Sequence, residues 1–517
     1  MSDRLRITGM YSGFDTESIV EQLVAAKQTK VDDLKAEQTK LGWKQEIWED
    51  LNSQIYSLYS STLSRLRLSS AYTGKTTTVS DTTKATVTAD STVVNGTQTL
   101  QINQLAKAQY WTGSSISKTT TTQDSSGNDV TTTTTYSSSS NLSAIDSTAL
   151  AEGTTFKVTT GDGTETEIEI TKDMTISDLV SALKDAGLNA SFDETNQRFF
   201  ISSTESGEEN SFTITATDAD GNATTDALSA LGLGDDMSVV EACDAEITLN
   251  GATFTSSSNT FSINGLTINA LSTTSDDEEL TIVTATDVDG IYDTIKDFLS
   301  EYNDLINKIY ALYNADSARD YEVLTDDEKD AMTDDEIETW EQTIKDSLLR
   351  NDTTLNSVFT TLTSTMMSGY SVNGTTMYLS DFGISTLGYF SAEDDERYAY
   401  HIDGDEDDDD TCDEDDLLRT AITNDPETVS EFFSSLCKSM YESLYSLMGR
   451  TDYSSIYKVY NDKKLDDDYD DYTDKIEEAE DELSEYEDYW YDKFSAMETA
   501  LSKLSSASSV VSSMLGS

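Results

Sequence analysis

The residues that could carry out chemistry are few in this 517-residue chain. His401 is the only histidine, and the three cysteines, Cys243, Cys412 and Cys437, are far apart in the sequence. Ser-His-Asp catalysis and multi-histidine zinc sites both need more than one lone histidine offers. Three scattered thiols form neither a disulfide framework nor a clustered ligand set. We therefore expect no catalytic residue, no metal site and no cofactor, and we expect that the protein is not an enzyme.

Carboxylates are the one abundant reactive group. The chain has 98 Asp and Glu residues against 33 Lys and Arg residues, so a pair of neighbouring carboxylates has no diagnostic value. Two acidic segments, Asp218–Asn222 and Asp403–Asp416, have the composition of calcium loops. Neither has the alternating ligands, the glycine at position six and the glutamate at position twelve of an EF-hand. We predict that residues 403–416 form a solvated, self-repelling acidic loop.

The net charge of −65 excludes several classes of partner. Nucleic-acid binding needs a basic surface, and an anionic membrane surface repels an acidic protein, so we expect no nucleic-acid partner. No apolar run is long enough for a transmembrane helix, so no membrane insertion is expected. The first fifteen residues lack the apolar core of a signal peptide. The chain is therefore predicted to be cytosolic or to be exported without a cleaved signal.

The two ends of the chain are predicted to be long helices that could pair with each other. An apolar residue recurs every seven positions in each, which places a seam along one side of a helix. Gly42 interrupts the first region and is predicted to mark a bend or break. The tail from Thr451 to Leu515 has no glycine or proline. The recurring residues are Leu34, Leu41, Trp48 and Ile55 near the start, and Ile476, Leu483, Trp490, Met497 and Leu504 near the end.

The middle of the chain is predicted to be rich in strands. Asn-Gly pairs at 95–96, 250–251, 264–265 and 373–374 indicate hairpin turns between β-branched segments. Thr175–Ala186 has the pattern of a short helix capped by Thr175. The Ser/Thr-rich stretch Ser114–Ser140 is a mobile loop or a long polar ribbon, and it could carry O-linked sugars. Further helices are predicted over Ile291–Leu312, Asp334–Thr365 and Thr428–Leu447.

Six segments of the chain, from Gly9–Leu23 at the start to Tyr489–Leu501 near the end, resemble in their order the flagellar hook-associated protein 2 family (FliD, the flagellar filament cap family). The opening Gly9–Leu23, which reads GMYSGFDTESIVEQL, resembles the family's N-terminal motif. The acidic run 403–416 and the serine-rich residues after Leu504 depart from the family's pattern. The other matching segments are Gln104–Gln109, Thr175–Leu183 with Ala190–Ser203, Ser257–Ser272, Trp340–Leu355 and Tyr489–Leu501.

This resemblance implies a multidomain α+β fold with a coiled-coil leg, a helical-bundle domain and two inserted β-rich head domains. Residues 1–42 and 465–517 are expected to form the leg, and residues 43–75 and 286–464 the bundle. Residues 76–112 and 240–285 are expected to form one head domain, and residues 113–239 the outer one.

The resemblance also implies a structural role at the distal tip of the bacterial flagellar filament, outside the cell, after export through the flagellar channel. A homo-oligomeric ring of unknown stoichiometry would promote flagellin folding and insertion and prevent loss of monomers. Further expected partners are the hook–filament junction proteins and the export apparatus with its chaperone. Two alternatives remain open: another axial protein (a flagellin or a junction adaptor), or an adhesin whose head binds host mucin or glycans.

Contacts with neighbouring copies or with the filament are expected along the leg and at the N-terminal motif. The candidate interface residues are Gly9, Ser12, Gly13, Asp15, Leu34, Leu41, Trp48, Ile55, Ile476, Leu483, Trp490, Phe494, Met497, Leu501 and Leu504.

Overall fold

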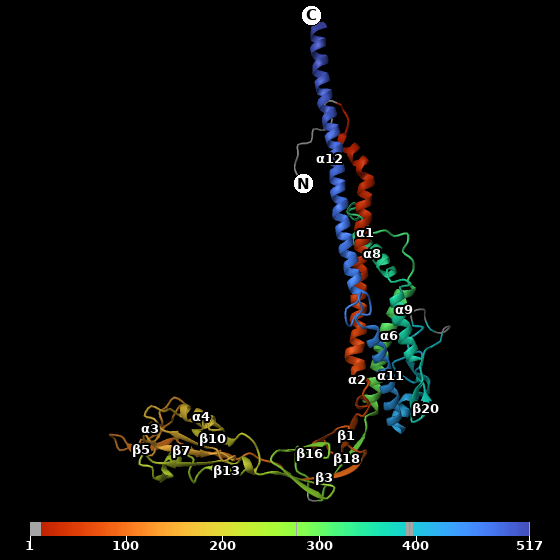
Figure 1. The fold of residues 1–517 in the computed structure, drawn as a ribbon. Helices are drawn as coiled ribbons and strands as arrows, with labels where there is room; N and C mark the ends of the chain where they lie inside the picture. Colours follow the sequence, from red (N-terminus) through yellow and green to blue (C-terminus); the bar gives the residue numbers. More distant parts are fainter. Residues whose placement is uncertain (1–11, 276, 389–391, 393–395, 516–517) are drawn as a thin grey trace. The chain divides into compact units, whose positions relative to one another are not determined.

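The computed structural model describes residues 12–275, 277–388, 392 and 396–515, and the side chains of 513–515 are outside the description. The chain divides into two compact units. Unit 1 comprises the described parts of residues 1–73 and 288–517, and unit 2 is Gly74–Asp287. The fold is multidomain α+β, with the strand-rich unit inserted between helical segments from both ends of the sequence (Figure 1).

Unit 1 is mainly helical. Its helices are α1 (Thr16–Ser57), the π-helical η1 (Leu58–Leu63), α2 (Ser64–Leu66), η2 (Ser69–Tyr72), α6 (Val288–Asn314), α7 (Asp326–Lys329), α8 (Asp334–Ser347), α9 (Thr353–Met366), η4 (Leu379–Phe382), α10 (Leu417–Asn424), α11 (Pro426–Leu447) and α12 (Asp462–Leu515). Two short antiparallel strand pairs accompany them: the hairpin of β19 (Tyr370–Val372) with β20 (Thr375–Met377), and β21 (Ile384–Ser385) with β22 (His401–Ile402).

The core of unit 1 is a helical bundle formed by the second half of α1 with α6, α9 and α11. Apolar residues at three- and four-residue spacing give each helix one buried face. Phe298 and Tyr302 of α6 and Phe432 and Phe433 of α11 are almost completely buried. The only proline in the sequence, Pro426, is the first residue of α11, where its missing N–H costs no hydrogen bond.

Three sequence predictions about these helices are wrong. Gly42 does not break the first helix, because α1 is continuous and Gly42 faces Tyr469 of α12, whose packing offsets the weak helix propensity of glycine. The last helix begins at Asp462, since residues 451–461 form turns that pack on the bundle. Asp334–Thr365 is two helices, because the chain turns at Asn351, which has a positive φ, and Asp352 caps α9.

Unit 2 contains two lobes, each with its own apolar core. The inner lobe has the sheet β1-β18-β3-β14-β15 and the smaller sheet β16-β17-β2. Its strands are β1 (Lys75–Val79), β2 (Ala85–Ala89), β3 (Gly96–Gln104), β14 (Ala245–Leu249), β15 (Ala252–Ser256), β16 (Thr260–Ile263), β17 (Leu266–Ala270) and β18 (Leu280–Thr286).

Local turn signals predicted the inner lobe only in part. The Asn250-Gly251 and Asn264-Gly265 pairs have positive φ values and join antiparallel neighbours, as predicted. The hairpin predicted at Asn95-Gly96 is wrong. There, β2 pairs with β17 and β3 pairs with β18 and β14, so the strands on either side of this turn belong to different sheets.

The outer lobe has two four-stranded sheets, β13-β4-β10-β9 and β12-β11-β7-β8, and helix α4 packs on β9. Thr175 caps α4 in a reciprocal box with Asp178, which confirms the predicted helix. The elements are β4 (Tyr110–Thr112), α3 (Leu142–Ile145), β7 (Thr155–Thr159), β8 (Glu165–Glu169), α4 (Ile176–Asp185), β9 (Leu188–Asp193), β10 (Arg198–Ser203), η3 (Glu208–Asn210), β11 (Thr213–Thr217), β12 (Ala223–Thr224), α5 (Asp226–Ala230) and β13 (Ser238–Val240).

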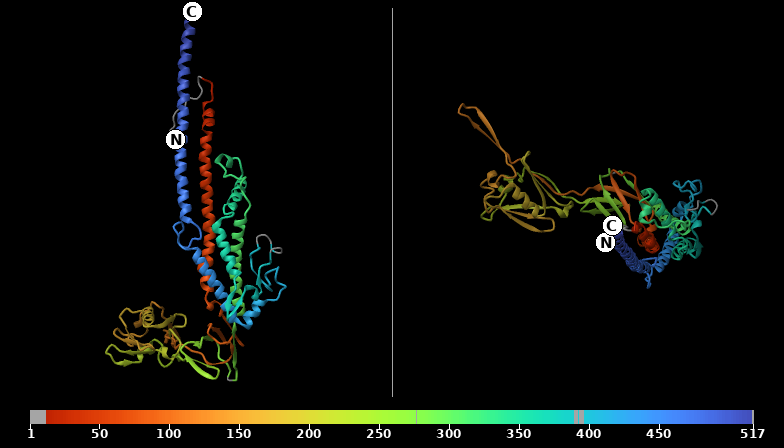
Figure 2. Two further views of the ribbon diagram at one scale, coloured as in Figure 1. Left: turned by 45° about the vertical axis from the view of Figure 1, so that its right-hand side comes forward. Right: turned by 90° about the horizontal axis from the view of Figure 1, so that it is seen from above.

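The Ser/Thr-rich stretch forms a two-stranded antiparallel ribbon, β5 (Lys118–Gln123) with β6 (Asp129–Thr134). Of the two sequence interpretations of this stretch, the polar ribbon is therefore correct. Figure 2 shows this orange ribbon extending from the body of its lobe. In the described part of the chain, no helix is both long and apolar enough to cross a membrane.

Candidate functional site

The helix pair formed by α1 and α12 is the candidate site of interaction, and its polar contacts fix how the two helices align. Gln45 donates to Asp466 at 2.8 Å, and Gln38 donates to Thr473 at 2.7 Å. Farther along, Lys35 pairs with Glu480 at 2.6 Å. From one contact to the next, the residue numbers fall on α1 while they rise on α12, so the two helices are antiparallel. Figure 1 shows them side by side. The predicted intrachain pairing of the two ends is confirmed.

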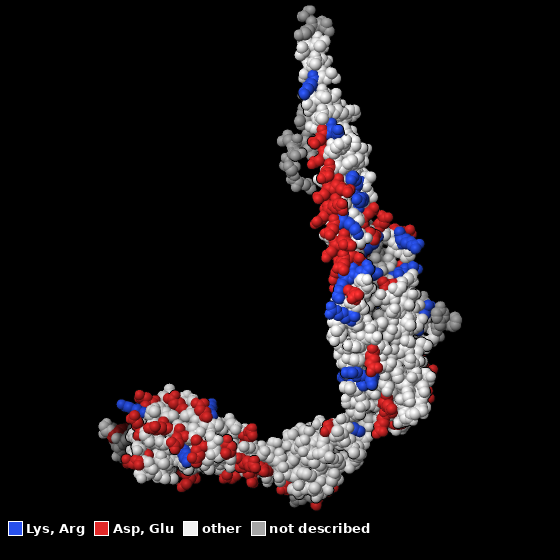
Figure 3. All heavy atoms as spheres, in the orientation of Figure 1, with Lys and Arg blue, Asp and Glu red and all other residues white. Residues whose placement is uncertain are grey.

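Oppositely charged side chains fix how α1 and α12 align, but they add little to the stability of the helix pair. Lys27 lies 3.2 Å and Lys30 lies 3.6 Å from Glu482; a hydrogen bond from Lys27, and then the positive charges of both lysines, hold the pKa of that carboxyl below its ordinary value. All three side chains are more than a third exposed. Exposed ion pairs such as these contribute little to stability, because water screens them. Carboxylates cover the middle of the helix pair on the face drawn in Figure 3. The lysines of α1 therefore reduce the repulsion among the carboxylates of α12.

The structure separates the predicted seam residues into two groups. Trp48 and Ile55 are fully buried in the bundle core, so they stabilise the fold and present no surface to a second molecule. Ile476 is also buried, at the level where α12 lies against α1. Leu504 is exposed, and the other helical positions are only half-buried in the single chain: Leu34, Leu41, Leu483, Trp490, Phe494, Met497 and Leu501.

The N-terminal motif reaches α12 near the start of α1. The backbone N–H of Ser12 donates to Glu498 at 3.2 Å, and the Glu498 side chain is almost completely buried. Asp15 accepts from the N–H of Ser18 and caps α1. Gly13, with φ of +73°, supplies the turn between these two anchors and is itself exposed. Gly9 lies outside the described residues.

The end of α12 continues beyond its alignment with α1. From Thr499 to Ser512 every side chain is exposed except the half-buried Leu501 and Ser502. Leu504 is 66% exposed and Val511 is 53% exposed. Residues 504–515 contain no charged residue. This uncharged helix with exposed apolar side chains is typical of a surface that another molecule covers.

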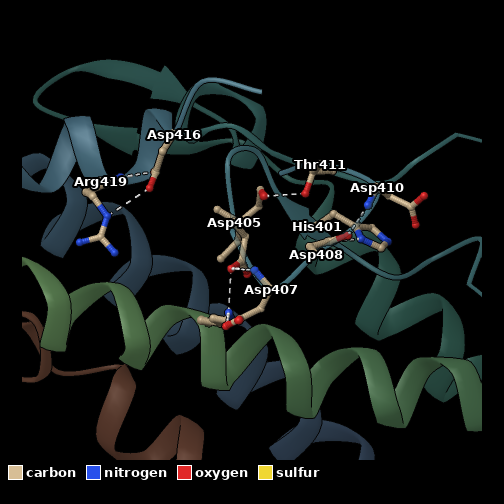
Figure 4. A network of polar contacts seen from close by, with 10 residues as sticks. His401, Asp405, Asp407, Asp408, Asp410, Thr411, Asp416 and Arg419 are labelled. Atoms are coloured by element: carbon tan, nitrogen blue, oxygen red, sulfur yellow. Dashed lines mark hydrogen bonds and ion pairs between the residues drawn. The ribbon is translucent and has the colours of Figure 1, made fainter. Parts of the chain in front are cut away.

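The acidic loop 403–416 is only in part the solvated, self-repelling loop that the sequence predicted: most of its carboxylates are exposed, but its centre contacts a lysine. Lys296 of α6 donates to Asp405 at 2.8 Å and to Asp407 at 2.7 Å. Asp405 is only 8% exposed, and Thr411 is buried and donates to the carbonyl of Ile402. Figure 4 shows Asp405 and Asp407 turned toward α6. An ammonium group from a distant helix therefore pairs with two carboxylates at the centre of the acidic run.

His401 and Arg419 complete this network. His401 Nδ1 and Asp408 Oδ2 are 2.7 Å apart, and Nε2 of His401 is buried without a hydrogen-bond partner in the described structure. Burial opposes ionisation of Asp408, but hydrogen bonds from His401 and from the N–H of Asp410 outweigh it, so the pKa of this carboxyl lies below its ordinary value. Arg419 contacts Asp289 and Asp416.

This network supports the fold and shows no features of a reactive centre. Within the described ranges, no group of three or more His, Cys, Asp or Glu side chains is arranged to hold a metal ion. Sequence reasoning missed Lys296 because one lysine on an amphipathic helix carries no signal of its partner. The half-buried Cys243, the exposed Cys412 and the buried Cys437 are all free thiols.

Comparison with known proteins places the chain in a family. The model described as "Flagellar hook-associated protein 2 N-terminus" matches residues 12–109, and the one described as "Flagellar hook-associated protein 2 C-terminus" matches residues 242–506. Together, the two matched segments cover most of unit 1 and the inner lobe of unit 2. The outer lobe lies between them in the sequence.

Curated relatives with the name flagellar hook-associated protein 2 agree with these matches. One from Halalkalibacterium halodurans is 24% identical over 463 residues, covering 85% of this chain and 81% of the relative. One from Thermotoga maritima is 26% identical over 361 residues, covering 68% of this chain and 53% of the relative. An A-type protein from Pseudomonas aeruginosa is 26% identical over 337 residues, covering 59% and 63%. The chain thus spans less than two thirds of the latter two.

A solved structure shows the same fold. The crystal structure of the flagellar cap protein FliD D1-D2-D3 domains from Escherichia coli aligns with a TM-score of 0.52 and 19% identity. The alignment covers 77% of this chain and 95% of that one. Because the family models together match more than half of the sequence, this chain belongs to the flagellar hook-associated protein 2 (FliD) family.

Proposed function

We propose that this protein caps the flagellar filament, as a structural component that retains flagellin subunits at the tip while they fold and join the filament. The family models, the curated relatives and the cap-protein structure support capping over the axial-protein and adhesin alternatives. The partners of this role are further copies of the chain in a ring and flagellin itself. The hook–filament junction proteins and the export apparatus with its chaperone belong to the same proposal.

The observation that carries the proposal is the helix pair. The two ends of the sequence form one antiparallel leg, and α12 continues past it as an uncharged helix with exposed Leu504 and Val511. A half-buried row containing Trp490, Phe494 and Met497 leads up to this end. A surface made of methionine and aromatic side chains adapts to changing neighbours, which suits a cap that must shift as subunits are added.

The charge distribution supports a contact at that end of the leg. The middle of α12 is crowded with carboxylates, which repel the same region of another copy, whereas residues 504–515 are uncharged. Neighbouring copies or the filament can therefore approach the end of α12 with little electrostatic cost. We place the protein outside the cell at the distal end of the flagellum, reached through the flagellar export channel.

A deletion strain tests the function. Without the protein, cells should release unpolymerised flagellin into the medium and carry few or short filaments, and the full chain on a plasmid should restore filament length. Normal filaments in the deletion strain would contradict a capping role. Loss of the filament's own subunit would indicate a flagellin instead, and normal motility with lost surface attachment would indicate an adhesin.

A further inference from the structure

The β5–β6 ribbon of the outer lobe is exposed on every side. All side chains of both strands are exposed, so neither face packs on the lobe. Threonine occupies positions 119–122 and 131–135, and Thr119–Thr133 and Thr121–Thr131 are cross-strand pairs. An isolated two-stranded ribbon is only marginally stable in water. Its exposure makes it a candidate for pairing with a third strand.

Both edges of the ribbon are open. Among the described residues, β5 and β6 pair only with each other. Asp124 and Asn128 form the first hydrogen-bonded pair next to the turn. Because hydrogen-bonded and non-bonded pairs alternate, the backbone groups of Thr119, Thr121 and Gln123 point outward from β5. Those of Asp129, Thr131 and Thr133 point outward from β6.

The ribbon lacks the features by which monomeric proteins protect strand edges. It has no proline and no bulge between the paired residues, and its charged residues lie at the two ends of the ladder. Natural edge strands avoid association through charged side chains, proline or bulges along the strand. On β5, four consecutive threonines separate Lys118 from Gln123, and threonine favours strand pairing.

Charge makes a second copy of the chain a suitable partner. The whole chain has a net charge of −65, but the only charged residues in the segment 113–135 are Lys118, Asp124 and Asp129. Strand β5 contains no carboxylate, so two copies can approach along this edge with little repulsion. The Lys118 side chain is 56% exposed; it donates to the carbonyl of Ile145 and lies 3.9 Å from Asp146.

We propose that two copies of this protein join through their β5 edges, which pair antiparallel and merge the two ribbons into one four-stranded sheet. Outward backbone groups must face each other, and Thr121 opposite Thr121 of the second copy satisfies this condition. The same register sets Lys118 opposite Asp124 of the second copy, at both ends of the new ladder. Opposite charges at facing positions favour that register over one shifted by two residues.

Disulfide trapping tests this pairing in the full-length protein. With Cys412→Ser as background, Thr121→Cys should give a disulfide-linked dimer under mild oxidation, because the two Cα atoms of a facing pair lie about 5.5 Å apart. The matched control is Val130→Cys, an equally exposed position on β6 that the proposed sheet keeps far from its counterpart. Dimers from Thr121→Cys alone support the proposal. Equal cross-linking of both variants, or of neither, overturns it.

Hydrogen exchange with residue resolution gives an independent test without new cysteines. The amides of Thr119, Thr121 and Gln123 should become protected as protein concentration rises, while those of Thr131 and Thr133 stay fast. Thr121→Pro removes an outward N–H without breaking a bond inside the ribbon, and it should abolish that concentration dependence. Unchanged protection in Thr121→Pro would contradict the proposal. The contact does not involve the leg, so it stands or fails separately from filament capping.

Discussion

Trp48 of α1 stacks on Tyr460, with the ring centroids 5.3 Å apart and the ring planes 9° from parallel. Tyr460 belongs to the turns that precede α12, so this contact joins segments more than 400 residues apart in the sequence. Asn52, one turn after Trp48, adds hydrogen bonds to Tyr457 and Val459. The turns that connect the bundle to α12 therefore pack against α1 and are hydrogen-bonded to it.

Trp48→Ala should destabilise unit 1 strongly. Replacing a buried tryptophan by alanine costs about 3–5 kcal/mol, because transfer free energy is lost and a cavity remains. Chemical denaturation of the purified protein measures this loss. Trp43→Ala is the matched control, since Trp43 lies on the same helix but is only half-buried beneath Lys345. A similar loss of stability in both variants would show that the Trp48–Tyr460 stack stabilises the protein no more than the contacts of a half-buried tryptophan do.

Lys296→Met should loosen the loop 403–416. Asp405 would lose its ammonium partner while remaining buried, at a cost of about 1–2 kcal/mol for this partly exposed pair. We expect faster cleavage of the loop by a protease. Lys464→Met, which removes an exposed pair with Asp468 within α12, should leave loop cleavage unchanged. Resistance of the Lys296 variant equal to that of the unmodified protein would refute the role of this lysine.

Acid should open the same loop in a defined pH range. The pKa of Asp408 lies below its ordinary value of 3.8 in the folded protein. The stability that this carboxylate supplies is therefore fully present above that ordinary value and is lost as the pH falls through the folded pKa. Loop protection should stay constant from neutral pH down to about 4 and then fall. Loss of protection already at pH 6 would contradict this assignment.

Protonation of the neighbouring Asp403 has the opposite effect on stability, and a variant of Asp408 distinguishes the contributions of the two carboxyls. Burial, followed by the charge of Glu414, raises the pKa of Asp403, so its protonation removes a cost from the folded state. In Asp408→Asn, the acid-induced opening should disappear, and protection at neutral pH should already be reduced. Hydrogen exchange of residues 401–416, corrected for the intrinsic rate at each pH, follows both effects.

Thr175→Ala should destabilise the outer lobe by about 0.5–2 kcal/mol, because the N-cap oxygen that accepts from Asp178 is removed. The affected amides of α4 should exchange faster by the corresponding factor. Ser177→Ala, at an exposed position within the first turn of the same helix, should change exchange little. Equal effects of the two substitutions would contradict the capping role of Thr175.

The sequence predicted the parts of this fold that depend on local patterns. Seven-residue spacing through Leu34 and Ile476 predicted that the two ends pair, and Thr175 marked the start of α4. The assignment of Trp48 to an interface failed, because the same apolar spacing serves a seam or a bundle core, and only the arrangement of α6, α9 and α11 decides between them. Likewise, Asn95-Gly96 has the turn signal of a hairpin, but the flanking strands find better partners far away in the sequence.

Long-range charge pairing was the hardest feature to predict. The sequence did not predict that Lys296 holds the centre of the acidic run 403–416, because this lysine is more than a hundred residues away on a helix with no distinguishing pattern. The contact between the N-terminal motif and α12 was not predicted either. Burial of Glu498 against Ser12 has no sequence signal, since a lone glutamate on an acidic helix indicates an exposed position.

The central claim is that the helix pair, and the end of α12 in particular, attaches this protein to the filament tip. The most direct test is to image filament tips by cryo-electron microscopy in cells whose only copy of the protein ends at Thr499. This truncation removes the exposed end of α12, including the uncharged residues 504–515, and leaves unit 2 and the bundle intact. We predict that caps disappear from the tips and unpolymerised flagellin accumulates in the medium. Caps at the frequency seen with the full chain would contradict the account.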